Sequence, residues 1–252
     1  NRIDVDDLEW SYLEGDGDFR SDEVTKLRDE SDIIITNPPF SLFREFLGWI
    51  VDGSKRFSMI VNKNAITYKE TFPMIRENLI WVGHTSMSQD MLFRVPKNRQ
   101  EELVTEGKEG SSWRRFDGEI LGRSTSIWMT NIEHGKRHQP LPLMTMEENI
   151  KFSKHKEIRG SEYQRYDNYD AIEVPFTDAI PSDYDGVMGV PISFLDKYSP
   201  EQFVILFKTE RDNPERTKIY SRSECPNAND LNRGPTVIVD GVPTNLYQRI
   251  MI

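Results

Sequence analysis

The spacing of hydrophobic positions in the first third of the chain alternates between the patterns of helices and strands. Residues 20–30 have the capping and charge pattern of a short helix. Residues 32–36 include three consecutive isoleucines, which is typical of a parallel strand buried on both faces. Apolar side chains recur at helical spacing over residues 41–51, and residues 57–61 predict a second buried strand. This order predicts an α/β fold with a parallel sheet covered on both faces.

The pattern changes after the second strand. Residues 65–77 predict a helix that an internal proline kinks or splits. Residues 79–83, 91–94 and 126–131 predict strands separated by irregular polar stretches. We therefore expect an antiparallel edge on the sheet.

A change in composition divides the chain near residue 139. From there onward the sequence is rich in proline and in loop-forming residues, and its main ordered stretches are MGVPISFLDKY and EQFVILFK. We therefore predict two regions, residues 1–138 with the α/β sheet and residues 139–252 with a mixed, loop-rich structure.

The composition is that of a folded protein without a membrane segment. A chain of 252 residues with 37% hydrophobic residues is able to bury a sizeable core. Its apolar runs are shorter than the ~20 residues that span a bilayer, and no signal-like segment starts it. The single cysteine, Cys225, excludes an internal disulfide and fits a reducing cytosol. We expect a cytoplasmic protein.

The formal net charge of −10 argues against a nucleic-acid partner unless basic residues gather locally. Short basic clusters occur in residues 94–99, 113–115 and 134–138. A solvated surface is the default explanation for each of them.

The stretch Asn37-Pro38-Pro39-Phe40 follows the first predicted strand directly. Ligands of open parallel sheets bind beyond the carboxyl ends of the strands. The two prolines fix the backbone and remove two N–H donors, so the loop presents carbonyl groups and holds them still. The side-chain carbonyl of Asn37 and the backbone carbonyl of Pro38 are two acceptors, and Phe40 offers a flat apolar face. Together they suit a planar amine.

Adenine is such an amine. Its exocyclic nitrogen is a poor nucleophile because its lone pair is delocalised into the ring. Two acceptors that take both N–H protons favour a pyramidal nitrogen, and fixed carbonyl dipoles stabilise the positive charge that develops on it. A base within a duplex is out of reach, so it has to be flipped into the site.

Asn37-Pro38-Pro39-Phe40 resembles the catalytic motif of methyltransferases that modify amino groups with S-adenosylmethionine. Its context, SDIIITNPPFSLFREF, is similar to the EcoRI-type adenine-specific DNA methyltransferases. Further stretches similar to that family are GDGDFRSDE, STSIWMTNIEH, YDAIEVPFTDAIPSDYDGVMGVPISFLDKYSPEQFVIL and YQRIMI. The resemblance therefore covers nearly the whole chain.

The resemblance implies a Rossmann-like methyltransferase sheet in residues 1–138 and a target-recognition region in residues 139–252. It implies S-adenosylmethionine as the cofactor, double-stranded DNA as the partner and no metal. The setting would be the cytoplasm of a bacterial or phage-infected cell. A cognate restriction endonuclease would act on the same DNA site without direct contact.

Asp18 and Phe19 match an Asp-Phe pair that contacts the adenine of the cofactor in the family. The carboxylate of Asp18 would accept a hydrogen bond from the adenine amine, and the neighbouring backbone or ring would border the base. A calcium loop is the alternative for this acidic turn, but the downstream ligands are missing.

One departure from the family pattern concerns the cofactor. The glycine-rich turn after a first strand and the acidic residue after a second strand are both missing before Asp18. We therefore expect the chain to begin inside the catalytic domain, without its N-terminal cofactor strands. By itself it should bind S-adenosylmethionine weakly or not at all and should methylate nothing.

The Asn37 motif leaves other functions open. Enzymes that methylate an amine in RNA or the glutamine amide of a protein use a similar arrangement. A DNA- or protein-binding module that kept the fold without catalysis is a further alternative. Only the family resemblance of the C-terminal half separates these from a DNA methyltransferase.

Overall fold

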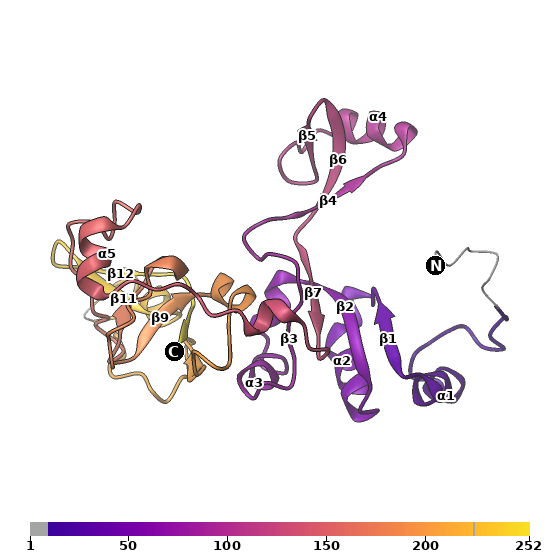
Figure 1. Cartoon of the computed structure of the whole chain (residues 1–252), viewed down its shortest axis with the longest axis horizontal. Helices are drawn as coiled ribbons and strands as arrows, with labels where there is room; N and C mark the ends of the chain where they lie inside the picture. Colours follow the sequence, from indigo (N-terminus) through magenta and orange to yellow (C-terminus); the bar gives the residue numbers. More distant parts are fainter. Residues whose placement is uncertain (1–9, 224) are drawn as a thin grey trace.

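The computed structural model describes residues 10–223 and 225–252. Two bodies lie side by side, and an arm rises from one of them (Figure 1). The body with the N-terminal elements holds a sheet with the strand order β1-β2-β7-β3. Its strands are β1 (Ile33–Thr36), β2 (Arg56–Asn62), β7 (Ser126–Thr130) and β3 (Trp81–Val82).

The sheet is mixed. Strands β1 and β2 run parallel, and helix α2 (Phe43–Asp52) connects them. Strand β7 is antiparallel to both of its neighbours, β2 and β3. The predicted parallel pair and the predicted antiparallel addition are therefore confirmed. The Rossmann-like arrangement stays a prediction, since the described strands form a single parallel pair in this sheet.

Local sequence explains the helices next to strands β1 and β2. The Ser21 hydroxyl accepts a hydrogen bond from the Val24 amide and caps helix α1 (Asp22–Glu30), as predicted. Helix α2 buries one apolar face, and its buried residues are Phe43, Phe46, Leu47 and Ile50. The predicted helix over residues 65–77 is split into a 3₁₀ helix, η3 (Lys63–Thr67), and α3 (Phe72–Arg76), which has its proline in the first turn.

The burial predicted for the isoleucine strand is wrong. Ile35 is 73% exposed and Ile33 is also exposed, so one face of β1 is open. Among the described residues, β1 lies at the edge of the sheet and has β2 as its one partner strand. The central strand β2 shows the alternation of a half-covered sheet, with Phe57, Met59 and Val61 fully buried. The exposure of β1 follows from its position at the edge of the sheet. A run of isoleucines in the sequence does not reveal that position.

The arm consists of residues 91–124, inserted between β3 and β7 (Figure 1). Its three antiparallel strands have the order β4-β6-β5. Its elements are β4 (Met91–Arg94), α4 (Lys97–Glu106), β5 (Trp113–Phe116) and β6 (Glu119–Ser124). The sequence predicted the first of these strands but not a separate sheet.

The second body is formed by the C-terminal half. Its sheet has the order β10-β13-β9-β8, and a separate hairpin joins β11 to β12. The strands are β8 (Ile172–Glu173), β9 (Met188–Pro191), β10 (Phe207–Lys208), β11 (Thr236–Val239), β12 (Val242–Asn245) and β13 (Arg249–Met251). The helices are α5 (Met146–Phe152) and α6 (Ala228–Leu231), with 3₁₀ helices η5 (Thr177–Ala179) and η6 (Ile192–Asp196).

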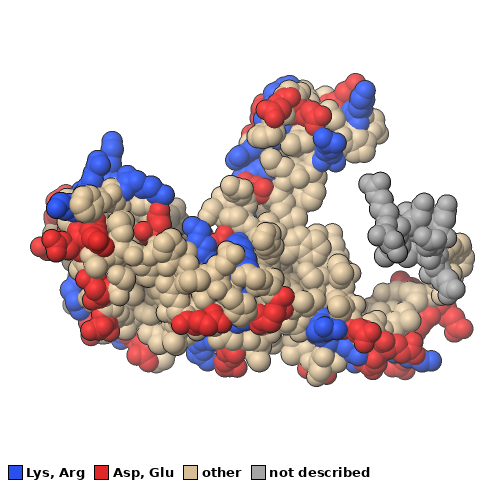
Figure 2. Space-filling view, in the orientation of Figure 1, with Lys and Arg blue, Asp and Glu red and all other residues tan. Residues whose placement is uncertain are grey.

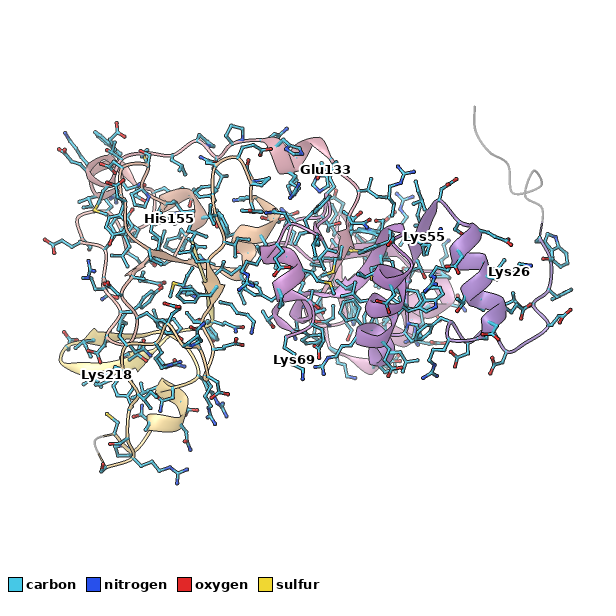
Figure 3. The ribbon with its side chains drawn as sticks, turned by 90° about the horizontal axis from the view of Figure 1, so that it is seen from below. Lys26, Lys55, Lys69, Glu133, His155 and Lys218 are labelled. Carbon is cyan, nitrogen blue, oxygen red and sulfur yellow. The ribbon has the colours of Figure 1, made fainter. Side chains whose placement is uncertain are left out.

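The two bodies share one hydrophobic core. Phe57 of β2 and Phe194 of η6 belong to the same buried cluster. The Asp196 carboxylate accepts hydrogen bonds from the Ser86 hydroxyl and the Met87 amide, at 2.9 and 2.7 Å. Glu133, just before the 3₁₀ helix η4 (Gly135–His138), lies between the bodies (Figure 3). The boundary near residue 139 thus crosses a continuous core, and the functional division of the chain stays a prediction.

Candidate functional site

The Asn37 motif forms the loop between β1 and the first turn of the following helix. Strand β1 ends at Thr36, and a 3₁₀ turn, η2 (Phe40–Leu42), leads into α2. The Pro39 carbonyl accepts a hydrogen bond from the Leu42 amide at 3.0 Å, which closes that turn. Pro38 is buried and anchors the loop. The motif therefore sits at the carboxyl end of a parallel strand, as the sequence predicted.

Asn37 and Phe40 face away from the core. The Asn37 side chain is exposed and has no hydrogen-bond partner within residues 10–223 and 225–252. The Phe40 ring is 48% exposed, although large apolar side chains are usually buried. An unengaged amide beside an exposed ring is an arrangement that fits a ligand better than it fits core packing.

A hollow of about 190 Å³ lies against Phe40. Pockets for drug-sized ligands are ~300–1,000 Å³, so this one suits a single small ring system. Its lining residues come from the Phe40 turn, the start of α2 and the segment after β2; they are Phe40, Phe43, Asn62, Asn64, Ala65 and Tyr68. The carboxyl ends of both parallel strands thus contribute to one hollow.

The far wall of the hollow is held in place by its own contacts. The Asn62 side-chain carbonyl accepts a hydrogen bond from the Asn64 amide at 2.9 Å. The rings of Phe43 and Tyr68 lie 6.2 Å apart, and the Arg44 guanidinium lies 4.7 Å from the Tyr68 ring centre. Sequence reasoning missed this wall. The available signal was Asn62, a polar residue at the end of the second strand, where the rule for parallel sheets places ligands.

Asp18 is half-buried, and its carboxylate accepts hydrogen bonds from Arg20. The Arg20 amide and Nε donate to Asp18 Oδ1 at 2.9 and 3.0 Å, and Nη2 donates to Oδ2 at 2.7 Å. These hydrogen bonds, the side-chain ones first, lower the pKa of Asp18 to about 2. Arg20 also reaches Glu45 of α2 at 3.2 Å. Asp18 is therefore a fixed carboxylate that stays ionised at neutral pH.

Phe19 belongs to the core. Its ring packs edge-on against Phe46 and Trp49 of α2, at centroid distances of 5.1 and 5.6 Å. The predicted cofactor pair thus contacts the helix that follows the Asn37 motif, and the Phe19 ring is occupied by packing. Among the described residues, no hydrogen bond, ion pair or ring contact joins Asp18 or Phe19 to the motif itself.

Three further features lie outside the Asn37 loop. A larger hollow of about 770 Å³ lies in the arm between α4 and the hairpin of β5 and β6, away from the Asn37 loop. Within the part of the chain that the structure describes, no group of three or more His, Cys, Asp or Glu residues is placed to hold a metal ion. No helix of the described ranges is long and apolar enough to cross a membrane.

Comparison with known proteins decides the family. A family model described as "Adenine-specific methyltransferase EcoRI" matches residues 1–252. The chain belongs to this family. As a member of the EcoRI methyltransferase family, it carries the Asn37 motif on an exposed loop at the carboxyl end of β1.

Individual relatives agree with the family assignment. The chain is 45% identical to the Type II methyltransferase M.EcoRI of Escherichia coli over 227 residues, which cover 89% of this chain and 64% of that protein. It is 34% identical to the Type II methyltransferase M.MpnI of Mycoplasma pneumoniae over 77% of this chain and 57% of the relative. A Mycoplasma genitalium relative, the Type II methyltransferase M.MgeORF184P, is 35% identical over the same shares. The chain thus spans about three fifths of the length of these relatives. No solved structure matches this EcoRI-family chain.

Proposed function

We propose that this protein transfers a methyl group from S-adenosylmethionine to the exocyclic amino group of adenine in a specific sequence of double-stranded DNA. The observation that carries the proposal is the unengaged Asn37 amide on an exposed loop at the carboxyl end of β1. The exposed Phe40 ring of the same loop lines a small hollow, whose lining does not include Asn37 itself. Membership of the EcoRI methyltransferase family supports the same reaction.

Asn37 and the Pro38 carbonyl bind the amine of the target base. Each oxygen accepts one N–H, which holds the nitrogen with its lone pair directed toward the methyl donor. The Phe40 face stacks on the flipped adenine ring and adds a cation–π contribution as charge develops. Fixed dipoles and correct positioning account for most of the expected rate enhancement.

The methyl transfer requires no metal to account for its atoms and electrons. S-adenosylmethionine, when bound, supplies an electrophilic methyl group on a sulfonium. The adenine nitrogen forms the new bond to the methyl carbon as the bond from that carbon to sulfur breaks, and the electron pair stays on sulfur. The nitrogen then releases one proton to solvent.

Asp18 is the residue that we propose for the adenine end of the cofactor. An ionised carboxylate has about four lone-pair sites. Three donors of Arg20 occupy Asp18, so one site remains for the amine of the cofactor. The Phe19 ring is packed in the core, so its contribution would be its backbone and the support that its ring gives to α2.

At the level of the fold, we propose that β1 and β2 with the crossover helix α2 are part of a Rossmann-like methyltransferase sheet. Residues 1–138 would form the catalytic region and residues 139–252 the target-recognition region. The DNA substrate would be the genome in the cytoplasm of a bacterial or phage-infected cell. A cognate restriction endonuclease would share the DNA site and not this surface.

The test uses a protein that includes the expected N-terminal cofactor strands and measures transfer of radiolabelled methyl from S-adenosylmethionine to duplex DNA, single-stranded RNA and a glutamine-containing protein, in parallel. We expect label in the duplex, on adenine, and its loss in the Asn37→Ala variant. Label in RNA or protein instead of DNA would replace the proposed substrate, and no label in any of them would refute the reaction.

A further inference from the structure

The arm exposes one complete face of its small sheet. Arg94 of β4 and Arg114 of β5 are both paired in register with Leu121 of β6. Directly opposed residues of antiparallel strands lie on the same face, and every second residue of a strand joins them. Leu92 and Phe116 therefore belong to this row, together with Glu119 and Arg123 of β6, which pair with Arg94 and Asp90. We call Arg94, Arg114, Leu121, Leu92 and Phe116 the open face of the arm.

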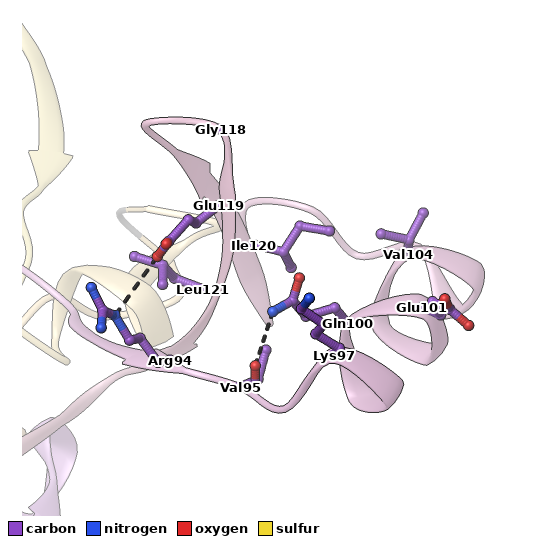
Figure 4. Close-up of a pocket in the computed structure, with 10 residues that line it drawn as sticks. All are labelled: Arg94, Val95, Lys97, Gln100, Glu101, Val104, Gly118, Glu119, Ile120 and Leu121. Carbon is purple, nitrogen blue, oxygen red and sulfur yellow. Dashed lines mark hydrogen bonds and ion pairs between the residues drawn. The ribbon is translucent and has the colours of Figure 1, made fainter.

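The other face of the arm sheet is covered by α4. The buried apolar side chains of the arm are Trp113 of β5 and Leu103 of α4, and the Trp113 indole donates to the Gly107 carbonyl at 2.7 Å. In Figure 4, Ile120 lies on the side of α4, whereas Leu121 and Arg94 lie on the opposite side of the hairpin. Helix α4 thus packs on part of this face, where Phe93 and Arg115 stay exposed. The open face has no covering element among the described residues.

The open face combines apolar surface with accessible cations. Phe116 is 59% exposed, and Leu92 is exposed as well. The ion pairs of the two arginines are long: Arg94 Nε lies 3.7 Å from Glu119, and Arg114 Nη2 lies 3.9 Å from Asp90. Exposed pairs of this length are weak, so both guanidinium groups are available to a partner.

The arm stands on the edge of the main sheet that carries the candidate site. Asn62, which lines the hollow, is paired with Ser126 at the start of β7, directly after the arm. The Lys63 ammonium donates to the carbonyls of Met87 and Gln89, both at 2.8 Å, in the segment that leads into the arm.

A cluster of three charged residues, Lys63, Asp90 and Arg123, connects the base of the arm to the main body. The Asp90 carboxylate lies between Lys63 of the main body and Arg123 of the arm. The Arg123 side chain, followed by Lys63, lowers the pKa of Asp90, so the cluster is charged at neutral pH. The open face is therefore held in place beside the site and does not depend on a flexible tether.

The arm differs from the rest of the protein in net charge. Residues 91–124 contain seven Lys or Arg and six Asp or Glu, whereas the whole chain has a net charge of −10. Figure 2 shows basic and acidic side chains mixed on the arm, basic ones over α5, and acidic ones along much of the lower edge of the molecule. A polyanion would meet the least repulsion along the upper side.

We propose that the open face of the arm binds the DNA duplex that carries the target adenine. Arg94 and Arg114 contact phosphates, and Leu92 and Phe116 pack against the sugars and base edges beside them. This inference rests on the proposed function and goes beyond it, because residues 139–252 were the expected DNA-binding region.

Arg115 provides a matched control. It follows Arg114 in β5, and their side chains are 57% and 53% exposed. Arg115 lies on the face of Trp113, at 5.5 Å from its ring centre, and so points away from the open face. Arg99 of α4 is a second exposed arginine outside the open face. The double variants Arg94→Gln/Arg114→Gln and Arg99→Gln/Arg115→Gln change the net charge equally.

The experiment measures the affinity of each double variant for a duplex that contains the methylation site, as a function of salt concentration. We expect Arg94→Gln/Arg114→Gln to weaken binding about tenfold or more and to reduce the slope of log K against log salt by about 2, one per lost phosphate contact. Arg99→Gln/Arg115→Gln should keep the wild-type slope. Thermal unfolding confirms that both variants are folded.

Three results would overturn the proposal. Wild-type affinity and slope in Arg94→Gln/Arg114→Gln would remove the open face from the DNA interface, and equal losses in the control would show a general charge effect. Sedimentation tests a second copy as the occupant: a dimer that only the open-face variant abolishes, with DNA binding intact, would also refute it. Methyl transfer by the wild type separates the two claims, since an active enzyme with a dispensable open face leaves the proposed function standing.

Discussion

Asn62, the last residue of β2, is paired in register with Ser126, the first residue of β7. Asn62 lines the hollow beside Phe40, and the arm ends at Ser124, two residues before Ser126. The candidate base site and the arm therefore meet where the carboxyl end of β2 pairs with the start of β7. A DNA duplex bound along the arm would reach the site without a large movement of either part.

The first prediction concerns Asn37. Asn37→Ala should lower kcat by about 10²–10³, the usual cost of removing one electrostatic contact to the transition state. The melting temperature should stay nearly unchanged, because the exposed amide has no partner in the described structure. Steady-state methyl transfer and thermal unfolding measure the two effects. Asn98→Ala, on the exposed side of α4, is the control. An active Asn37→Ala enzyme would remove the motif from the chemistry.

Phe40 gives the second prediction. Phe40→Ala should weaken binding of the flipped base by about 1–3 kcal/mol, the scale of base–aromatic stacking. Phe40→Tyr and Phe40→Trp should keep substantial activity, because a flat face remains. Affinity for a duplex with a mismatched target adenine, which flips more easily, measures the loss. Equal function of Phe40→Val would show that the ring has another role.

The third prediction concerns pH and the contact between the two bodies. His138 lies 2.6 Å from Glu201 and 2.7 Å from Glu133. Hydrogen bonds to Glu201 and then Glu133 raise the pKa of His138, and the bond from His138 lowers the pKa of Glu201 to about 2. A histidine pKa that is higher in the folded than in the unfolded protein stabilises the folded state. This stabilisation is complete at pH values below the pKa of the unfolded protein, and it is lost as the pH rises through the pKa of the folded protein.

The lowered pKa of Glu201 acts in the opposite direction. Its contribution is present above the unfolded glutamate pKa and is lost as pH falls through the folded value of about 2. The cluster should therefore stabilise the protein most between about pH 4.3 and 6.5, the unfolded values of Glu and His. Melting temperatures across pH 4–8 for the wild type and His138→Gln measure this. Parallel curves for the two proteins would contradict it.

The fourth prediction contrasts two apolar residues of the main sheet. Met59 is fully buried in β2, so Met59→Ala should lower the free energy of unfolding by about 2–5 kcal/mol. Ile35 is largely exposed on β1, so Ile35→Thr should change it by no more than about 0.5 kcal/mol. Urea unfolding of both variants gives the comparison. A large loss in Ile35→Thr would mean that another surface covers this edge in solution.

The sequence by itself determined the local elements around the site. The cap at Ser21, the turn made by Pro38 and Pro39 and the apolar stripe of α2 depend on neighbouring residues alone. The motif at Asn37 could be recognised for the same reason, since its chemistry is contained in a few consecutive positions. These features followed from backbone sterics and helical periodicity, which act within one or two turns of chain.

The tertiary structure decided everything that depends on distant partners. The openness of Ile35 follows from the edge position of β1, and Phe19 is buried because α2 packs on it. The hollow needs Asn62 to lie across from Phe40. Arg94 and Arg114 share a face only because both pair with the strand between them. Strand order and register are set by contacts between segments far apart in the sequence, and hydrophobic periodicity within one segment carries no information about its neighbours.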